Sequence, residues 1–243
     1  MHTSAPQTAS AAPLLSARAL TKSYGATYAL AGVDIDLRPG EAVAIMGASG
    51  SGKTTLLHVL AGIIAPDSGT VALETRAGLR LVHELPDSER SRLRREEFGF
   101  VFQQGLLLPE LTAVENVALP LMLTGHARAE AQEHAARWLA TLGLAGMENR
   151  RIGQLSGGQA QRVAIARAQA TGARVVFADE PTGALDSATS VDVMTALLNA
   201  TLDQGHALVV VTHDPRVAAR CTRTVRLSDG KVVADETATA AAR

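Results

Sequence analysis

A glycine-rich segment between a short apolar run and a helical pattern has the composition of a phosphate-binding loop. Residues 47–54 read Gly-Ala-Ser-Gly-Ser-Gly-Lys-Thr and fit the pattern G-x-x-x-x-G-K-[ST]. Glycines let the backbone curl so that its N–H groups point at phosphate oxygens, and the positive end of the following helix adds to the attraction. We expect Lys53 to reach the β and γ phosphates of a nucleotide and the Thr54 hydroxyl to ligate Mg²⁺. The alternative, an ordinary glycine-rich turn with a solvated lysine, is disfavoured by the flanking strand and helix.

A second chemical group lies at the end of another apolar run. Residues 175–179 read Val-Val-Phe-Ala-Asp, so Asp179 closes a segment of the kind buried in a parallel sheet. Taken alone, such an acid is more often a helix cap or a turn residue. In a chain that also contains a phosphate loop, Asp179 is the expected second Mg²⁺ ligand.

The elements that position these groups follow from hydrophobic periodicity. Residues 14–37 alternate apolar and polar side chains and predict a small β layer ahead of the core, while 85–97 and 113–144 predict a mostly helical insertion. The pair Asp229-Gly230 predicts a hairpin turn within 225–233. Further predicted elements are strands at 42–46, 174–178 and 207–211, a helix over 53–61 that stops at Gly62, and a helix from Ser156 to about Ala170.

Bulk properties limit the function classes. The chain has 243 residues and a formal net charge of −1, so it lacks the basic footprint of a nucleic-acid binder. Its single cysteine, Cys221, suits a reducing compartment. Residues 1–12 are predicted to be a disordered lead-in without the features of a signal peptide, and the apolar runs are shorter than the roughly 20 residues that cross a bilayer. If the protein serves a membrane process, we expect another chain to supply the membrane part.

Residues 155–162 read Leu-Ser-Gly-Gly-Gln-Ala-Gln-Arg, and here the sequence resembles the ATP-binding-cassette family. Ser156 has the residue type of a helix cap, and Gly157 and Gly158 expose backbone N–H groups at the positive end of that helix, which makes a second anion site. The resemblance covers residues 14–235 approximately. It implies an α/β fold of the P-loop nucleotide-hydrolase type, with an N-terminal antiparallel β layer and a helical insertion at about 104–155, one domain over 13–235 and a tail over 236–243. It also implies a head-to-tail dimer in which two ATP molecules are sandwiched.

The same resemblance assigns roles to single residues. Glu180 is similar to the catalytic base that orients or deprotonates water, and a structural carboxylate is its alternative. His213 resembles the switch histidine that senses the γ phosphate, and Gln103, favoured over Gln104, resembles the glutamine that contacts Mg²⁺ or water. Tyr24 is expected to stack on adenine, although it has the alternative of packing on the β layer. The nucleotide contacts implied are Tyr24, Gly47, Ala48, Ser49, Gly50, Ser51, Gly52, Lys53, Thr54, Thr55, Ser156, Gly157, Gly158, Gln159 and Asp186.

A narrower resemblance comes from residues 94–103, Arg-Arg-Glu-Glu-Phe-Gly-Phe-Val-Phe-Gln, and from Leu107-Leu-Pro109. This segment is similar to the branch that contains MacB, LolD and FtsE, whose members serve FtsX-like permeases. Ile152-Gly153 departs from the proline frequent in this branch, and Ala184 departs from the residues common before Asp186. The implied location is the cytoplasmic face of the inner membrane, with attachment through the permease.

Three functions remain open on the sequence. The first is the ATPase subunit of an exporter that moves lipoprotein, peptide, macrolide or lipid. The second uses the same closure to transmit force across the membrane without transport. The third, a soluble relative that acts on DNA or ribosomes, is disfavoured because the chain has neither a basic surface nor a second cassette. The leucines at 106, 107, 108 and 111 are expected either to contact the permease or to pack under the helical insertion.

Overall fold

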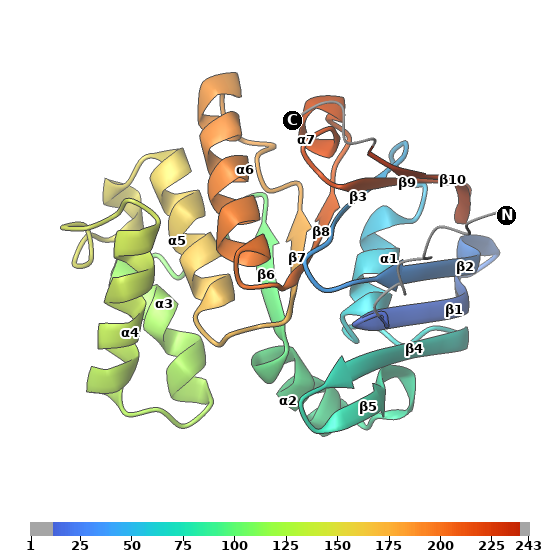
Figure 1. Ribbon diagram of the computed structural model, residues 1–243, viewed down its shortest axis with the longest axis horizontal. Coiled ribbons are helices and arrows are strands. Elements are labelled where there is room, and N and C mark those ends of the chain that lie inside the picture. The colour runs from blue at the N-terminus through green and yellow to red at the C-terminus, as the bar shows by residue number, and fades with distance from the viewer. Residues whose placement is uncertain (1–11, 239–243) are drawn as a thin grey trace, which may run out of the picture.

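The computed structural model describes residues 12–238 as two sheets flanked by helices (Figure 1). The smaller sheet has the strand order β2-β1-β4-β5, and its strands pair in an antiparallel manner. The larger sheet has the order β10-β9-β3-β8-β7-β6, and only its edge strand β10 is antiparallel to its neighbour. This architecture confirms the predicted fold class.

The strands of the smaller sheet are β1 (Leu15–Tyr24), β2 (Thr27–Leu37), β4 (Ser68–Thr75) and β5 (Gly78–Leu81). Those of the larger sheet are β3 (Ala42–Met46), β6 (Phe98–Phe102), β7 (Val175–Asp179), β8 (Ala207–Val211), β9 (Arg223–Ser228) and β10 (Lys231–Thr237). The helices are α1 (Lys53–Leu60), α2 (Asp87–Glu96), α3 (Ala113–Leu123), α4 (Arg128–Thr141), α5 (Gly157–Gln169), α6 (Ser187–Leu202) and α7 (Pro215–Ala218), with short 3₁₀ turns at Val82–Glu84 and Ile152–Gln154.

Alternating side chains of the larger sheet fill two separate cores. In β3, Ala42, Ala44 and Met46 join the core that contains α3, α4, α5 and α6. Val43 and Ile45 point the other way and join the core formed with α1 and the smaller sheet. Because successive residues of a strand face opposite sides, a wholly apolar five-residue strand buries both faces. Helices α1 and α5 therefore lie on opposite faces of the larger sheet (Figure 1).

Most of the predicted elements are present. The hairpin turn has Asp229 at φ 48 and Gly230 at φ 72, and these two positive values are what the predicted two-residue turn requires. Strand β10 continues to Thr237, so Glu236 and Thr237 belong to the sheet rather than to a tail that begins at 236. Of the predicted lead-in over 1–12 and tail over 236–243, residues 1–11 and 239–243 lie outside the described residues.

The sequence analysis missed β4, β5, β6, α6 and α7. Strand β6 escaped notice because it lies between a charged helix and the predicted helical insertion, and its five residues carry no polar alternation. It pairs with β7 in parallel from Phe98↔Val175 to Phe102↔Asp179, so it is the edge strand of the larger sheet. Helices α3 and α4 lie within the segment 104–155 that was expected to form the insertion.

Helix α5 packs directly on β6 at Gly99. A Cβ atom added there would lie 2.4 Å from the backbone oxygen of Ala168 in α5. No flexible side chain can move to relieve this contact, since the opposing atom belongs to the backbone. Gly99 thus sets how closely the helix approaches the sheet.

We expect Gly99→Ala to lower the free energy of unfolding by about 1–3 kcal/mol, because the added methyl group forces α5 away from β6. Urea denaturation of the purified chain measures this difference. Gly153→Ala is the matched control, since a Cβ at Gly153 meets nothing within 4 Å. Equal stability of the two variants would contradict the role given to Gly99.

Candidate functional site

The phosphate loop connects the end of β3 to the start of α1. Gly50 has φ 79 and Gly52, the residue that caps α1, has φ 103, and both values favour glycine. A Cβ on Gly52 would lie 2.1 Å from the carbonyl oxygen of Ala29 in β2, so the smaller sheet reaches the loop. The Lys53 ammonium donates to the carbonyl oxygens of Gly47 at 2.9 Å and Ala48 at 2.8 Å and lies across the loop.

A cavity of about 260 Å³ opens at this loop. It brings together the loop, the ends of β7 and β8, and one residue of the smaller sheet. Its lining is Ala29, Ser49, Gly50, Gly52, Lys53, Thr54, Thr55, Asp179, Glu180 and Val211. Of the residues singled out by sequence, the loop and both acids thus meet in one place.

Two oxygen atoms that could ligate a metal ion lie close together in this cavity. The Thr54 hydroxyl donates to Oδ2 of Asp179 at 3.4 Å. Burial raises the pKa of Asp179, and the neighbouring Glu180 carboxylate raises it further. A cation between these oxygens would offset the repulsion of the two acids, so the donor set has the chemistry of a hard metal ion.

Glu180 is held by the segment that follows β8. Its Oε1 accepts from the backbone N–H of His213 at 3.1 Å and lies 2.7 Å from Nδ1 of that residue, while its Oε2 accepts from the Thr212 hydroxyl at 3.2 Å. The backbone of Glu180 has φ 47, a conformation uncommon for a non-glycine residue. Contacts on both carboxylate oxygens hold the Glu180 side chain in the lining of the cavity.

The same contacts orient His213. Its imidazole is 76% exposed, and the hydrogen bond to Glu180 raises its pKa, as does the charge of that carboxylate. Thr212 is buried and was not assigned a role from the sequence. Its position next to the predicted His213 was a usable signal, but only the folded strand shows that its hydroxyl points at Glu180.

The remaining predicted residues lie outside the cavity lining. The Gln103 amide packs against the loop after Glu180, because a Cβ on Gly183 would lie 3.0 Å from Nε2 of Gln103. Tyr24 is 55% exposed at the end of β1. Asp186 is the N-cap of α6, where its Oδ1 accepts from the N–H groups of Ala188 and Thr189 at 3.0 Å each.

Residues 156–159 form the start of α5 on the other face of the sheet. Ser156 and Gln159 make reciprocal capping bonds of 3.2 and 2.9 Å, as expected of a helix-capping serine. A Cβ on Gly158 would lie 2.4 Å from Cγ2 of Thr189 in α6, so this glycine is also required by helix packing. That second role was not visible in the sequence, because it depends on where α6 lies.

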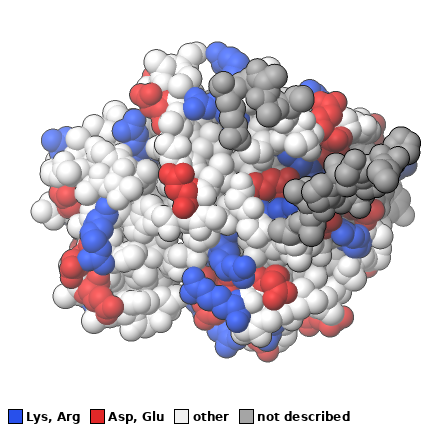
Figure 2. All heavy atoms as spheres, in the orientation of Figure 1, with Lys and Arg blue, Asp and Glu red and all other residues white. Residues whose placement is uncertain are grey.

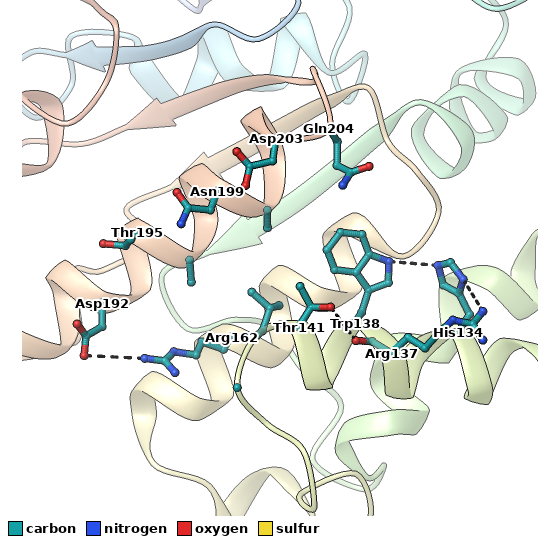
Figure 3. A pocket seen from close by; sticks show the side chains of 14 residues that line it. His134, Arg137, Trp138, Thr141, Arg162, Asp192, Thr195, Asn199, Asp203 and Gln204 are labelled. Carbon is teal, nitrogen blue, oxygen red and sulfur yellow. Dashed lines mark hydrogen bonds and ion pairs between the residues drawn. The ribbon is translucent and has the colours of Figure 1, made fainter. Parts of the chain in front are cut away.

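A larger groove lies elsewhere, between α4 and α6. It encloses about 690 Å³ and is lined by Trp138, Thr141, Arg162, Asn199 and other residues (Figure 3). The indole N–H of Trp138 donates to Nε2 of His134 at 3.1 Å. This groove shares no lining residue with the cavity at the phosphate loop, and it offers no glycine-rich run of backbone donors for phosphate.

Two relatives with similar sequences are named as export ATP-binding/permease proteins. The macrolide export ATP-binding/permease protein MacB of Burkholderia thailandensis is 47% identical over 231 residues, which cover 93% of this chain and 34% of MacB. The pyoverdine export ATP-binding/permease protein PvdT of Pseudomonas savastanoi pv. phaseolicola is 47% identical over 228 residues, which cover 92% of this chain and 34% of PvdT. The chain thus spans about a third of the length of these relatives.

Known structures and a family model agree with this likeness. A dimeric structure of the ATP-binding cassette MJ0796 in a post-hydrolysis state, bound to ADP and Pi, is 39% identical with a TM-score of 0.82, covering 92% of this chain and 98% of the MJ0796 chain. A second dimeric structure of MJ0796 is 40% identical with a TM-score of 0.81. The family model described as ABC transporter matches residues 30–183. The chain therefore belongs to the ABC transporter family and comprises the ATP-hydrolysing cassette of such a protein.

Proposed function

We propose that Glu180 is the base that positions water against the γ phosphate of ATP held by the phosphate loop. The observation that carries this proposal is that Thr212 and His213 hold the Glu180 carboxylate in the lining of the cavity at the phosphate loop. Phosphoryl transfer depends mainly on positioning and charge stabilisation. In this assignment the loop N–H groups and Lys53 neutralise the phosphates, Glu180 takes the proton of the attacking water, and His213 senses the γ phosphate.

We also assign Thr54 and Asp179 as the residues that hold Mg²⁺, with Gln103 at the edge of the same site. Within residues 12–238 no group of three or more His, Cys, Asp or Glu side chains could hold a metal ion. The two facing oxygens of Thr54 and Asp179 therefore suit an ion that completes its ligand shell with nucleotide oxygens and water. Bound there, Mg²⁺ would neutralise charge on the phosphates as they react.

The arrangement of the two anion sites supports a dimer. The phosphate loop precedes α1 on one face of the larger sheet, and Ser156–Gln159 begin α5 on the other face. One chain is thus poorly placed to close both sites on one nucleotide. We infer a head-to-tail dimer in which the start of α5 in one copy covers the ATP held by the other, an inference consistent with the dimeric structures of MJ0796.

The membrane partner that we propose is an FtsX-like or MacB-like permease. Both relatives named above are ATP-binding/permease proteins. Among the described helices, none is long and apolar enough to cross a membrane. On the likeness to these ATP-binding/permease proteins, we propose that the cassette lies at the cytoplasmic face of the inner membrane, attached to the permease. Nucleic acid is not a proposed partner, because acidic and basic side chains are interspersed on the face shown in Figure 2 and the net charge is −1.

The segment from Gln103 to Glu115 is the proposed contact with the permease. Leu106 is 58% exposed and Leu108 is 43% exposed, whereas Leu107 packs against the core that contains α3 to α6. The four leucines singled out by sequence therefore divide: Leu106 and Leu108 face solvent, Leu107 packs against the core, and Leu111 is half-buried. Exposed leucines next to Gln103 suit a surface that passes nucleotide-driven movement to a partner.

We expect Glu180→Gln to lower the rate of ATP turnover by about 10²- to 10⁴-fold while ATP binding remains, because the amide keeps the size of the side chain but cannot accept the proton. Phosphate release measures turnover, and gel filtration with ATP detects a long-lived dimer. Glu133→Gln, at an exposed carboxylate on α4, is the control. Turnover of Glu180→Gln near that of the parent chain would remove Glu180 from this role.

Mixing two inactive variants tests the shared site. Ser156→Arg should block dimer closure by filling the start of α5, and Lys53→Ala should weaken nucleotide binding because it deletes a charge at the phosphates. Together they can still form one composite site from the intact loop of the first and the intact α5 of the second. Crosslinking should show ATP-dependent pairing of the mixture. Ser156→Ala, which loses only the helix cap, separates steric block from helix destabilisation. No recovered pairing, where the parent chain pairs, would contradict the model.

We expect Leu106→Asp and Leu108→Asp to abolish copurification with the permease while the melting temperature and the ATPase rate of the free cassette stay near those of the parent. The reason is that both side chains are exposed, so a charge there opposes docking without entering the core. Leu79→Asp is the control, since Leu79 is 64% exposed on β5 of the other sheet. Permease retained by both variants would place the docking surface elsewhere.

A further inference from the structure

The turn of the C-terminal hairpin lies against the phosphate loop. Strand β9 runs parallel to β3, with Met46 paired to Arg226, so the segments that follow these two strands leave the sheet side by side (Figure 1). The phosphate loop follows β3, whereas Asp229 and Gly230 follow β9 and turn the chain into β10. A turn near the far end of the chain is therefore a direct neighbour of the loop.

Two close backbone approaches join the turn to the loop. The N–H group of Gly230 donates to the carbonyl oxygen of Ser51 at 3.2 Å. A Cβ atom added to Gly47 would lie 2.3 Å from the carbonyl oxygen of Leu227 at the end of β9. The hairpin thus contacts the loop at its first residue and again at Ser51, both times through backbone atoms.

Strand β2 holds the turn from the other side. The N–H group of Ala31 donates to the carbonyl oxygen of Gly230 at 2.8 Å. A Cβ atom on Gly230 would lie 2.9 Å from the carbonyl oxygen of Ala29, and a Cβ atom on Gly52 would lie 2.1 Å from the same oxygen. Three stretches of backbone therefore meet at Ala29, where neither glycine has room for a side chain.

The bond from Gly230 orients one peptide group of the loop. Residues 12–238 contain no cis peptide bond, and in a trans peptide the C=O and N–H groups point in opposite directions. Because the carbonyl of Ser51 points at the turn, the N–H group of Gly52 points away from it. Gly52 lines the cavity at the loop, whereas Ser51 does not. The bond therefore directs this N–H group to the side where a phosphate would lie.

We propose that Gly230 is a positioning residue for nucleotide binding, because it holds the peptide group between Ser51 and Gly52 in the orientation that a phosphate requires. The proposal rests on the proposed function, in which the N–H groups of the loop neutralise the phosphates of ATP. Gly230 is not part of the cavity lining, so its effect passes through the loop. A loop that is already oriented avoids the entropic cost of ordering its backbone when ATP binds.

A purely structural role of the turn predicts different kinetics. Val225 and Leu227 of β9 are buried in the core that contains α1, so damage to the hairpin also lowers stability. Partial unfolding lowers kcat in proportion to the inactive fraction and leaves KM unchanged. A misoriented loop in a folded chain raises KM instead, because it weakens binding. The kcat value should persist, since Glu180, Thr212 and His213 follow β7 and β8.

The test measures KM for ATP and kcat of the full chain with Gly230→Ala. The added methyl group meets the Ala29 carbonyl and should push the turn away from the loop. We expect KM to rise about tenfold, the change expected for loss of one hydrogen bond to a charged group, while kcat stays within about threefold of the parent. Gly205→Ala is the matched control and should keep the parental KM: its φ is 71 against 72 at Gly230, but a Cβ atom there meets nothing within 4 Å.

A second variant separates the position of the turn from the bulk of the methyl group. One glycine inserted between Asp229 and Gly230 lengthens the turn and moves its N–H donor without adding a side chain. This insertion should raise KM to a similar extent, whereas one glycine inserted after Gly205 should not. The melting temperature of each variant shows whether it folds. Failure of both hairpin variants to fold would assign the turn to stability alone and reject the proposal.

Three kinetic results would also reject it. These are a parental KM in a folded hairpin variant, a fall in kcat at parental KM, and an equal rise of KM in Gly205→Ala. The proposed function is judged separately. A parent chain that does not hydrolyse ATP, or a Lys53→Ala variant with parental ATP affinity, rejects the phosphate-loop assignment. A parent chain that hydrolyses ATP, with hairpin variants of parental KM, rejects the role of Gly230 alone.

Discussion

The parallel pairing of β3, β8 and β7 is the constraint on which the nucleotide site depends. Ile45 pairs with Val211, and Val211 pairs with Asp179, so the three strands end at one level of the sheet. A chemically distinct segment lies at the end of each strand: the phosphate loop after β3, Asp179 and Glu180 at the end of β7, and Thr212 and His213 after β8. A shift of one residue in either pairing would turn every side chain of that strand to the other core and would separate Glu180 from its two donors.

The same alternation that buries both faces of the sheet also separates the two anion sites. Apolar residues on both sides of β3 require helices on both faces, and α1 and α5 meet this requirement from opposite sides. Both helix starts have the chemistry of anion sites, but they belong to different cores. A site completed by a second copy therefore depends on the way the two cores are built, as well as on the phosphate loop and residues 155–162.

Close approaches of backbone fix the positions of the helices. Gly99 admits α5 against β6, and Gly158 admits Thr189 of α6 against the start of α5. Asp186 caps α6, so the loop after Glu180 leads into α6, while Ser156 begins the neighbouring α5. A displacement of the loop after Glu180 would therefore shift the start of α6, which packs against the start of α5 at Gly158 and Thr189. Arg167 ties α5 in turn to Gly105 and Leu106, at the surface assigned to the permease.

The sequence by itself determined the chemistry of the site and the family, because a phosphate loop needs residues at fixed spacing within one short segment. Gly47–Thr54, Asp179 and the capping Ser156 were predicted on such local signals, whereas the role of Glu180 was predicted from the family resemblance. The confirmed strands were those with clear apolar runs or alternation. Strand β6, Thr212 as a donor to Glu180, the second role of Gly158 and the division of the leucines were decided only by the tertiary structure. Each of these depends on atoms far apart in the chain, and a single sequence does not specify which segments meet. The three arginines Arg94, Arg167 and Arg223 illustrate this limit. Arg94 and Arg167 donate to neutral oxygens, whereas Arg223 pairs with Glu41 and Asp235, and only the tertiary structure decides which of them lies next to an acid.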